Sequence, residues 1–287
     1  MALKRQKSFE NELPSLYLVP TPIGNLEEFS PRQINVLNQV DIIAAEDTRT
    51  TKGLLQHFNI KTPLIAHHAH NQYQSASGIL KLLEDGKTVA LVSDSGYPLI
   101  NDPGNEVVKL AIKAGFNVIP VSGSSAFING LVASGLLVHP FLFHGFLPST
   151  KKALRRTLKE WKYFSYTLVF YISVHSLRET LSEVLEVMGD RNACLAREIT
   201  KRHEEFIRGS LSELIEVSDQ LKGELVLILE GNPHEKEGDI AEINYLELID
   251  DKINQGLSAS QAIKVIAQEY QVSKNLLYDL YHGGLDS

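Results

Sequence analysis

The stretch KTVALVSDSGYPLINDPGNEVVKLAIKAG, residues 87–115, carries the pattern that decides the fold. Its apolar start predicts a buried strand that ends near Ser93, and residues 105–114 predict a helix closed by Gly115. Between them lies a run with two aspartates, two glycines and two prolines, longer than an ordinary strand-to-helix connection needs. We expect this long loop to form a wall of a binding pocket.

The same alternation of strands and helices extends from Ser15 to Val121. Ser30 followed by Pro31 is a typical helix start, because serine caps the first amides and proline suits the first helical position. Strands alternating with helices require crossover connections and therefore a mainly parallel, doubly wound sheet. The strands are expected at residues 15–20, 40–46, 62–66, 87–93 and 116–121, and the helices at 30–39, 48–58, 72–84 and 105–114.

A second, mixed αβ segment is expected from about Ser124 to Gly231, with strands at 141–146, 166–171, 192–198 and 223–231. The charged stretch GNPHEKEGD then interrupts the pattern and predicts a linker. Three amphipathic helices follow, at 244–256, 258–270 and 273–283. The predicted organisation is a mobile tail (1–14), an N-terminal αβ domain (15–123), a second αβ domain (124–232), and a linker with a helical extension (233–287).

Composition excludes several classes of protein. The 287 residues include 28 basic and 35 acidic side chains, a net charge of -7, so a uniformly basic nucleic-acid binder is excluded while a local basic patch is not. The single cysteine, Cys194, allows no disulfide within the chain and favours a reducing, cytoplasmic setting; core packing is its expected role. We expect no secretory signal and no membrane span.

The loops that follow the predicted strands concentrate polar and glycine residues. Because residues after parallel strands emerge at one edge of a sheet, these loops are expected to form one cleft. The nucleotide-binding motifs GxGxxG and Walker A are absent, as are the metalloprotease motif HExxH and the hydrolase motif GxSxG. The loops offer backbone amides at Gly24, Gly96 and Gly123, small hydroxyls and few full charges, which suits a zwitterionic or weakly charged ligand. They are residues 19–26, 45–50, 66–71, 93–104 and 121–126.

Six motifs in this order resemble the ribosomal RNA small-subunit methyltransferase I family of the tetrapyrrole methylase superfamily. The resemblance covers about residues 16–231, and the helical tail is similar to the family's C-terminal helix-turn-helix-like extension. The motifs are LYLVPTPIGNL (16–26), DIIAAEDTRTTKGLL (41–55), LVSDSGYPLINDPG (91–104), VSGSSAFINGLVASGL (121–136), FLFHGFLP (141–148) and AREITKRHEEFIRGSLSEL (196–214).

The resemblance implies a homodimeric enzyme that methylates the ribose 2′-hydroxyl of a cytidine in small-subunit ribosomal RNA, either free or in the assembled subunit. It implies the tetrapyrrole methylase fold, with S-adenosylmethionine bound between two αβ domains. The cofactor-binding residues that it implies are Thr21, Pro22, Gly24, Ser93, Asp94, Ser95, Gly96, Ile100, Ser122, Gly123, Ser124, Ser125, Ala126, Tyr171 and Gly231.

Some positions depart from the family pattern. Ser95 stands for the usual alanine, Tyr97 for a threonine, and GSSA (123–126) for Gly-Pro-Ser-Ala. In FYISVHSL (170–177), Ile172, Val174 and Ser176 replace an acid, a proline and an arginine. Asn71 is followed by Gln72 where an acid is usual. The changed segment at 170–177 puts substrate positioning and activity in question.

Candidate catalytic groups follow from the chemistry. A ribose hydroxyl is a poor nucleophile and needs a proton acceptor or a polarising cation. The residues Glu46, Asp47 and Arg49 follow the second strand, and their alternative role is a helix cap, since Asp47 and Thr48 cap helices well. The second candidate set lies on a predicted strand of the second domain, where the alternative is a cross-strand salt bridge; it comprises Arg197, Glu198 and Lys201.

Basic residues at helical spacing predict a phosphate-contacting face, or else a merely solvated one. They include Lys151, Lys152, Arg155 and Arg156, with Lys159 and Lys162 further along. The histidines at 67, 68 and 70 are expected to form a polar loop and no metal site, because no acid lies at ligand spacing. The C-terminal helices are a plain bundle, an RNA-docking element or a dimer element.

Two other functions fit the sequence. One is a small-substrate methylase of the same superfamily, acting on a tetrapyrrole or a modified protein. The basic helix and the helical tail argue against it. The other is a non-catalytic cofactor-binding or ribosome-assembly protein, which the changed segment at 170–177 makes plausible. In the preferred interpretation Asp94 faces the cofactor or shapes the turn, and Asp102 caps the helix that follows.

Overall fold

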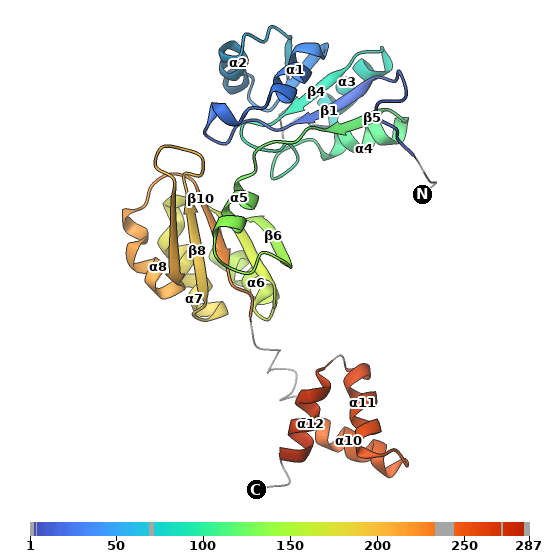
Figure 1. Ribbon diagram of the computed structural model, residues 1–287, viewed down its shortest axis with the longest axis vertical. Coiled ribbons are helices and arrows are strands. Elements are labelled where there is room, and N and C mark those ends of the chain that lie inside the picture. The colour runs from blue at the N-terminus through green and yellow to red at the C-terminus, as the bar shows by residue number, and fades with distance from the viewer. Residues whose placement is uncertain (1–2, 4, 69–71, 233–243, 271, 284–287) are drawn as a thin grey trace. The chain divides into compact units, whose positions relative to one another are not determined.

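The computed structural model describes residues 3, 5–68, 72–232, 244–270 and 272–283. The chain divides into two compact units, Met1–Gly231 and Asn232–Ser287. The first unit contains two five-stranded sheets, which Figure 1 shows with their helices. None of the helices in the described part of the chain combines the length and the apolar character that crossing a bilayer requires.

The first sheet is entirely parallel, with the strand order β3-β2-β4-β1-β5. Its strands are β1 (Ser15–Val19), β2 (Ile42–Ala45), β3 (Leu64–Ala66), β4 (Val89–Val92) and β5 (Asn117–Pro120). Apolar clusters cover both faces: one packs against α1 (Pro31–Gln39) and α2 (Thr48–His57), the other against α3 (Gln72–Glu84) and α4 (Asn105–Ala114). The doubly wound α/β prediction is therefore confirmed.

Local chemistry explains where these helices begin and end. Ser30 and Gln33 form a reciprocal capping box at the start of α1, with Pro31 at the first helical position. Gly115 ends α4 in the left-handed conformation, at φ 94°. The four residues of β4 are all buried, as expected for a central strand covered on both faces.

The second sheet is mixed, with the order β6-β7-β10-β8-β9. Its strands are β6 (Phe141–Phe146), β7 (Thr167–Ile172), β8 (Asn192–Arg197), β9 (Glu205–Ser210) and β10 (Leu225–Leu229). Only β6 and β7 pair in parallel; the other neighbours are antiparallel. Helices α5 (Ala126–Ala133), α6 (Lys151–Trp161), α7 (Leu177–Met188) and α8 (Leu211–Val217) belong to this part, and Cys194 is buried in its core. β9 is a strand that the sequence did not predict.

The second unit consists of α10 (Tyr245–Asn254), α11 (Ala259–Glu269) and α12 (Lys274–Gly283). The three helices share an apolar core that includes Ile249, Ile263 and Leu277. The three predicted amphipathic helices are confirmed. Most of the predicted linker lies outside the described residues, and the predicted boundaries at 14, 123 and 232 stay predictions.

Candidate active site

A cavity of about 550 Å³ lies at the carboxyl ends of the parallel strands. The loops after β1, β2, β4 and β5 all contribute to its wall, as predicted from the parallel topology. The described residues of the loop after β3 do not line it: His67 is buried and its Nδ1 lies 2.7 Å from Ser75 Oγ. From the second sheet, the wall receives residues 171–175, at the end of β7 and just after it, and residues 223–226, just before β10 and at its start.

The cavity is lined by four carboxylate side chains, and no lysine or arginine is among the described residues that line it. The prediction of few full charges in the cleft was therefore wrong. Such a lining favours a ligand that carries positive charge and disfavours phosphate groups. The four acids are Glu46, Asp94, Asp102 and Glu224.

Asp102 differs most from an ordinary surface acid. Burial raises its pKa to about 7, with further contributions from the charge and hydrogen bond of Glu46 and from the charge of Asp94. The predicted role of Asp102 as a helix cap was wrong, because Gly104 is the N-cap of α4 and no side chain caps that helix. Asp102 and Glu46 instead form a hydrogen-bonded carboxyl pair in the cavity wall.

The loop after β4 is braced from within the chain. The amides of Thr21 and Gly96 each donate to the other residue's carbonyl, at 2.9 and 3.0 Å. Thr21 Oγ1 donates to the Ser93 carbonyl at 3.0 Å, and Ser93 Oγ donates to the Gly96 carbonyl at 2.7 Å. The expectation that the Gly96 amide is available to a ligand was wrong. Thr21 and Ser93 hold Asp94 and Ser95 in the cavity wall.

The loop after β5 shows the same kind of internal support. The Gly123 amide donates to Tyr97 Oη at 3.0 Å, and Ser124 Oγ donates to Glu28 Oε2 at 2.8 Å. A Cβ at Gly123 would lie 2.5 Å from a Pro20 side-chain carbon, so close packing explains the glycine. Tyr97 therefore has a defined partner in the chain. Ser125 and Ala126 line the cavity, as do Ile100 and Tyr171 among the implied cofactor residues.

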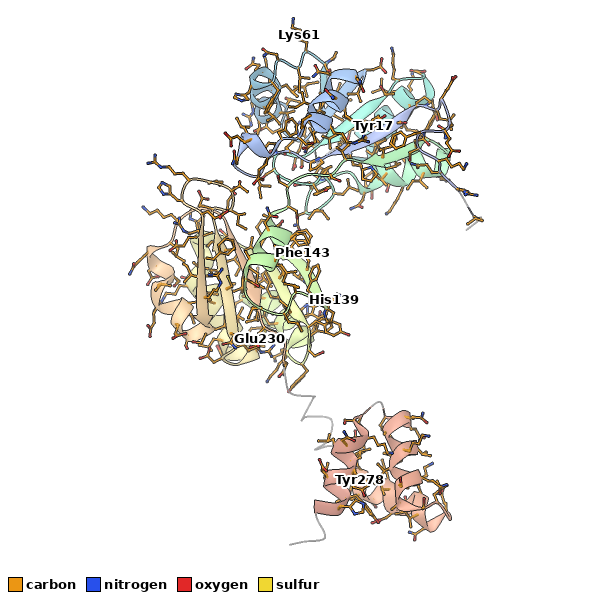
Figure 2. The ribbon with its side chains drawn as sticks, viewed as in Figure 1. Tyr17, Lys61, His139, Phe143, Glu230 and Tyr278 are labelled. Atoms are coloured by element: carbon orange, nitrogen blue, oxygen red, sulfur yellow. The ribbon has the colours of Figure 1, made fainter. Side chains whose placement is uncertain are left out.

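Other implied cofactor residues lie away from the cavity. Gly231 follows β10 at the opposite end from Leu225 and Val226, which line the cavity; Figure 2 labels its neighbour Glu230 at that far end of the mixed sheet. A Cβ there would lie 2.2 Å from the Ser165 carbonyl oxygen, so the glycine is explained by packing. Pro22, Gly24 and Ser122 are likewise not in the cavity wall, although Ile23 is.

Asp47 and Arg49 form a surface pair beside the cavity. The Asp47 carboxylate accepts from the Arg49 amide at 2.8 Å, which makes Asp47 the N-cap of α2. The Arg49 guanidinium also donates to the Asp47 carboxylate. The hydrogen bonds from the Arg49 side chain, and next those from its amide, lower the pKa of Asp47 to about 2. The alternative prediction of a helix cap is confirmed. The Asp47 amide also donates to Asp94 Oδ1 at 3.2 Å and so helps to position that acid.

Arg197 ends β8 and forms the cross-strand salt bridge that the sequence suggested, with Arg197 Nε 2.8 Å from Glu205 Oε2. Glu198 and Lys201 lie in the following turn, so their placement on a strand was wrong. Glu198 has a positive φ of 50° and Thr200 one of 69°. Lys201 Nζ lies 2.9 Å from Glu198 Oε1 and 3.0 Å from Glu224 Oε2, so this cluster braces the cavity rim through Glu224.

The predicted basic face on α6 is divided by ion pairs. Lys151 and Arg155 pair with Glu183 of α7, and Arg155 also pairs with Glu186. Lys152 and Arg156 are exposed and have no ion pair among the described residues. Lys152 and Arg156 are therefore better placed than the other two to contact a polyanion.

Comparisons with known proteins agree with these features. The family model described as Tetrapyrrole (Corrin/Porphyrin) Methylases matches residues 15–215. The ribosomal RNA small subunit methyltransferase I of Bacillus subtilis (strain 168) is 43% identical over 98% of this chain and 99% of that protein. The chain belongs to the ribosomal RNA small subunit methyltransferase I family. The protein of that name in Escherichia coli O157:H7 is 42% identical over 96% of this chain and 97% of its own.

Solved structures support the fold of this methyltransferase I family member. A diphthine synthase aligns with a TM-score of 0.59 and 12% identity, over 75% of this chain and 90% of that one. A uroporphyrin-III C-methyl transferase from Thermus thermophilus, complexed with S-adenyl homocysteine, aligns with a TM-score of 0.54 and 19% identity, over 75% of this chain and 97% of that one. At these identities the likeness establishes the tetrapyrrole methylase fold alone.

The segment that departs from the methyltransferase I family pattern lies in the cavity wall. The lining includes the last residue of β7 and the three residues that follow it: Ile172, Ser173, Val174 and His175. Sequence reasoning missed the contributions of Phe146 and Glu224 to the wall. A signal for Phe146 was present in the sequence, because it ends the predicted apolar strand 141–146 and residues at strand ends contribute to the cleft.

Proposed function

We propose that this chain transfers a methyl group from S-adenosylmethionine to the ribose 2′-hydroxyl of a cytidine in small-subunit ribosomal RNA. The acid-lined cavity is the observation that carries the proposal. S-adenosylmethionine is a cation at its sulfonium and ammonium groups, which the carboxylates suit. The adenosine part suits the apolar wall of Ile23, Ala126, Ile199 and Val226, and about 550 Å³ is ordinary for a small-molecule site.

The cofactor supplies a methyl group on a sulfonium, and the residues that would hold it are 94–96, Ile100, Ser125, Ala126 and Tyr171. The chain's own task is to align the hydroxyl, exclude water and take its proton. We assign the proton to the Asp102 carboxylate, which would take the proton of the ribose 2′-hydroxyl when that oxygen accepts the methyl group. Glu46 tunes that carboxylate, and Asp47, Arg49, Arg197, Glu198 and Lys201 are assigned positioning roles.

RNA is proposed to contact α6 through Lys152 and Arg156, which are exposed and form no ion pair among the residues that the structure describes. Changing Lys152 and Arg156 to glutamine is expected to weaken RNA binding by about tenfold or more and to flatten its salt dependence. Changing Lys151 and Arg155 to glutamine, as the matched pair, is expected to act more weakly, because both already pair with Glu183. Filter binding at several salt concentrations measures the difference, and equal effects of the two pairs would contradict it.

A homodimer and a cytoplasmic location complete the proposal. Val132 of α5 and Leu137, which follows that helix, are 64% and 65% exposed, a high exposure for apolar side chains that supports a protein contact in this part of the chain. Analytical ultracentrifugation measures the oligomeric state. For the helical unit, residues 232–287, we propose RNA docking.

Mapping ribose methylation in small-subunit ribosomal RNA from cells with and without the gene tests the function. Loss of one methylated cytidine ribose is the expected result, and no change at any site would contradict the substrate. Calorimetry with S-adenosylmethionine separates proteins that bind the cofactor from those that do not, and absence of binding would count against both methylase functions. A rival methylase binds the cofactor without methylating RNA, and a non-catalytic protein transfers no methyl group to any acceptor.

A further inference from the structure

A second cavity, of about 690 Å³, adjoins the acid-lined one. Its wall is formed where β6 and β7 end and where α6 and α7 begin. β6 and β7 are parallel, so both helices start at the same edge of the mixed sheet. Four residues line both cavities, which makes the second cavity a continuation of the first: Phe146, Tyr171, Ile172 and Ser173.

The two cavities differ in charge. The second has two cations, Lys151 and Arg178, and two acids, Glu179 and Glu183, so its charges balance. Lys151 is paired with Glu183, and Arg178 with Asp219. The rest of the polar wall is hydroxyl groups, from Ser149, Ser173, Ser176, Thr180 and Ser182. A balanced, hydroxyl-rich cavity suits an uncharged polar ring rather than a phosphate.

Phe146 forms the wall between the two cavities. Its side chain is 61% exposed, although an aromatic ring of this size is usually covered. The ring centroid lies 5.2 Å from that of Tyr171, which fixes one edge of the exposed ring. Tyr171 is also close enough to Asp102 for the charge of that acid to contribute to raising its pKa, after burial, to about 12. An exposed aromatic face therefore lies beside the proposed proton acceptor.

An exposed aromatic ring beside the proposed proton acceptor can bind the base of an RNA nucleotide by stacking. An acceptor ribose has to approach the acid-lined cavity while its phosphates stay outside, because four carboxylates repel them. Proteins that act on a single nucleotide often take its base out of the stack and hold it against an aromatic ring. A cytosine amino group is a donor that a carboxylate or a hydroxyl accepts.

We propose that the second cavity receives the base of the nucleotide that is methylated, stacked on Phe146, with its ribose at the opening shared with the first cavity. The inference rests on the proposed function, since it names the subsite for the same RNA substrate. Phe146 also lines the first cavity, but it is not among the residues proposed to hold S-adenosylmethionine, and we assign it to positioning the acceptor. Its removal is therefore expected to lower methylation of RNA and to leave the affinity for the cofactor largely unchanged.

The test compares Phe146→Ala with Phe146→Trp in steady-state methylation of a small-subunit RNA fragment. Phe146→Ala is expected to lower kcat/KM by roughly tenfold or more, as the loss of base stacking does, and Phe146→Trp to retain most of it. Phe9→Ala is the matched control, because Phe9 is also highly exposed, at 74%, and lines neither cavity. The Phe9 ring instead lies beneath the guanidinium group of Arg32. Calorimetric affinity for S-adenosylmethionine is expected to stay at the wild-type value in all three variants.

A cavity-filling variant and a fluorescent base sharpen the test. Ser176→Trp fills the second cavity at a position that makes no side-chain cap hydrogen bond, and it is expected to reproduce the loss. A fluorescent cytosine analogue at the methylated position is expected to change emission on binding to wild type and less so with Phe146→Ala. If kcat/KM is undiminished in Phe146→Ala and Ser176→Trp, the base-binding site is wrong while the proposed function stands. If the wild-type protein binds no S-adenosylmethionine, both the proposed function and the base-binding site are wrong.

Discussion

Two groups of acids at the edges of the two sheets have opposite electrostatics. Asp102 lies beside Glu46 and Asp94 with no cation among the described residues of its cavity wall, and burial together with these like charges raises its pKa to about 7. Glu198 accepts from the Glu224 amide and pairs with Lys201, and these contacts lower its pKa. Sequence alone made Glu198 a catalytic candidate and Asp102 a cap.

The difference shows that surroundings decide which acid can take a proton. A carboxylate held by an amide and an ammonium group is too weak a base to accept a proton at neutral pH. A carboxyl group kept among other acids holds its proton more tightly and returns it near pH 7, which suits general-base catalysis. The cavity acids therefore carry the chemistry, and the Glu198 cluster supports the cavity rim.

The largest effect is expected from Asp102→Asn. Loss of a general base lowers the rate of the chemical step by about 10² to 10⁴-fold. Single-turnover methylation of RNA measures it, and S-adenosylmethionine calorimetry shows whether the variant still binds the cofactor. Asp41→Asn is the control, because Asp41 lies just before β2, at the opposite end of that strand from Glu46 and the cavity. The methylation rate of this variant is expected to match that of the wild type. A near-normal rate in Asp102→Asn would remove Asp102 from the mechanism.

Asp102→Asn is also expected to change stability, by a smaller amount: the variant loses activity but becomes more stable at alkaline pH. Asp102 binds a proton more tightly in the folded chain than an aspartate with the ordinary pKa of 3.8 does, so its contribution to stability falls as pH rises from about 4 to about 7. Asp102→Asn is therefore expected to raise the free energy of unfolding at pH 8 by about 1 to 2 kcal/mol, discounted for partial exposure. The gain shrinks toward pH 5. Urea unfolding at both pH values checks this, and a variant less stable than wild type at pH 8 would refute it.

The smallest effect is expected from Lys201→Met. Its ion pairs with Glu198 and Glu224 are partly exposed, and such pairs contribute about 0.5 to 1 kcal/mol to stability. Methylation is expected to fall only slightly, through a looser cavity rim. Urea unfolding and single-turnover rates measure the two quantities. A large loss of rate at unchanged stability would return Lys201 to the catalytic residues and break the distinction between the two groups.

The parallel sheet was predictable because its signals are local. Apolar runs such as β4 and caps such as Ser30 with Pro31 depend on neighbours in the chain. β9 was not predictable in the same way: it is an edge strand in which Glu205 and Arg208 are exposed and Gly209 interrupts the apolar pattern. An edge strand needs few apolar residues, so its periodicity is weak.

The site was predictable as a place but not in its electrostatics. Strand-end loops converge because of topology, and that rule requires only the order of elements. The pairing of Asp102 with Glu46 joins segments far apart in the sequence, and Asp-Pro-Gly before a helix resembles an ordinary cap. The Gly96 and Gly123 amides were misjudged for the same reason, since their acceptors, Thr21 and Tyr97, lie in other segments.

The pH dependence of single-turnover methylation tests the role of Asp102 most directly. The wild-type rate is expected to fall as pH drops below about 7, the pKa at which Asp102 takes up its proton. In Glu46→Gln this acid limb is expected to move to lower pH, because the charge and hydrogen bond of Glu46 help to raise the pKa of Asp102. A rate that is flat from pH 5.5 to 8, or an acid limb that Glu46→Gln leaves in place, would contradict the assignment of the proton to Asp102.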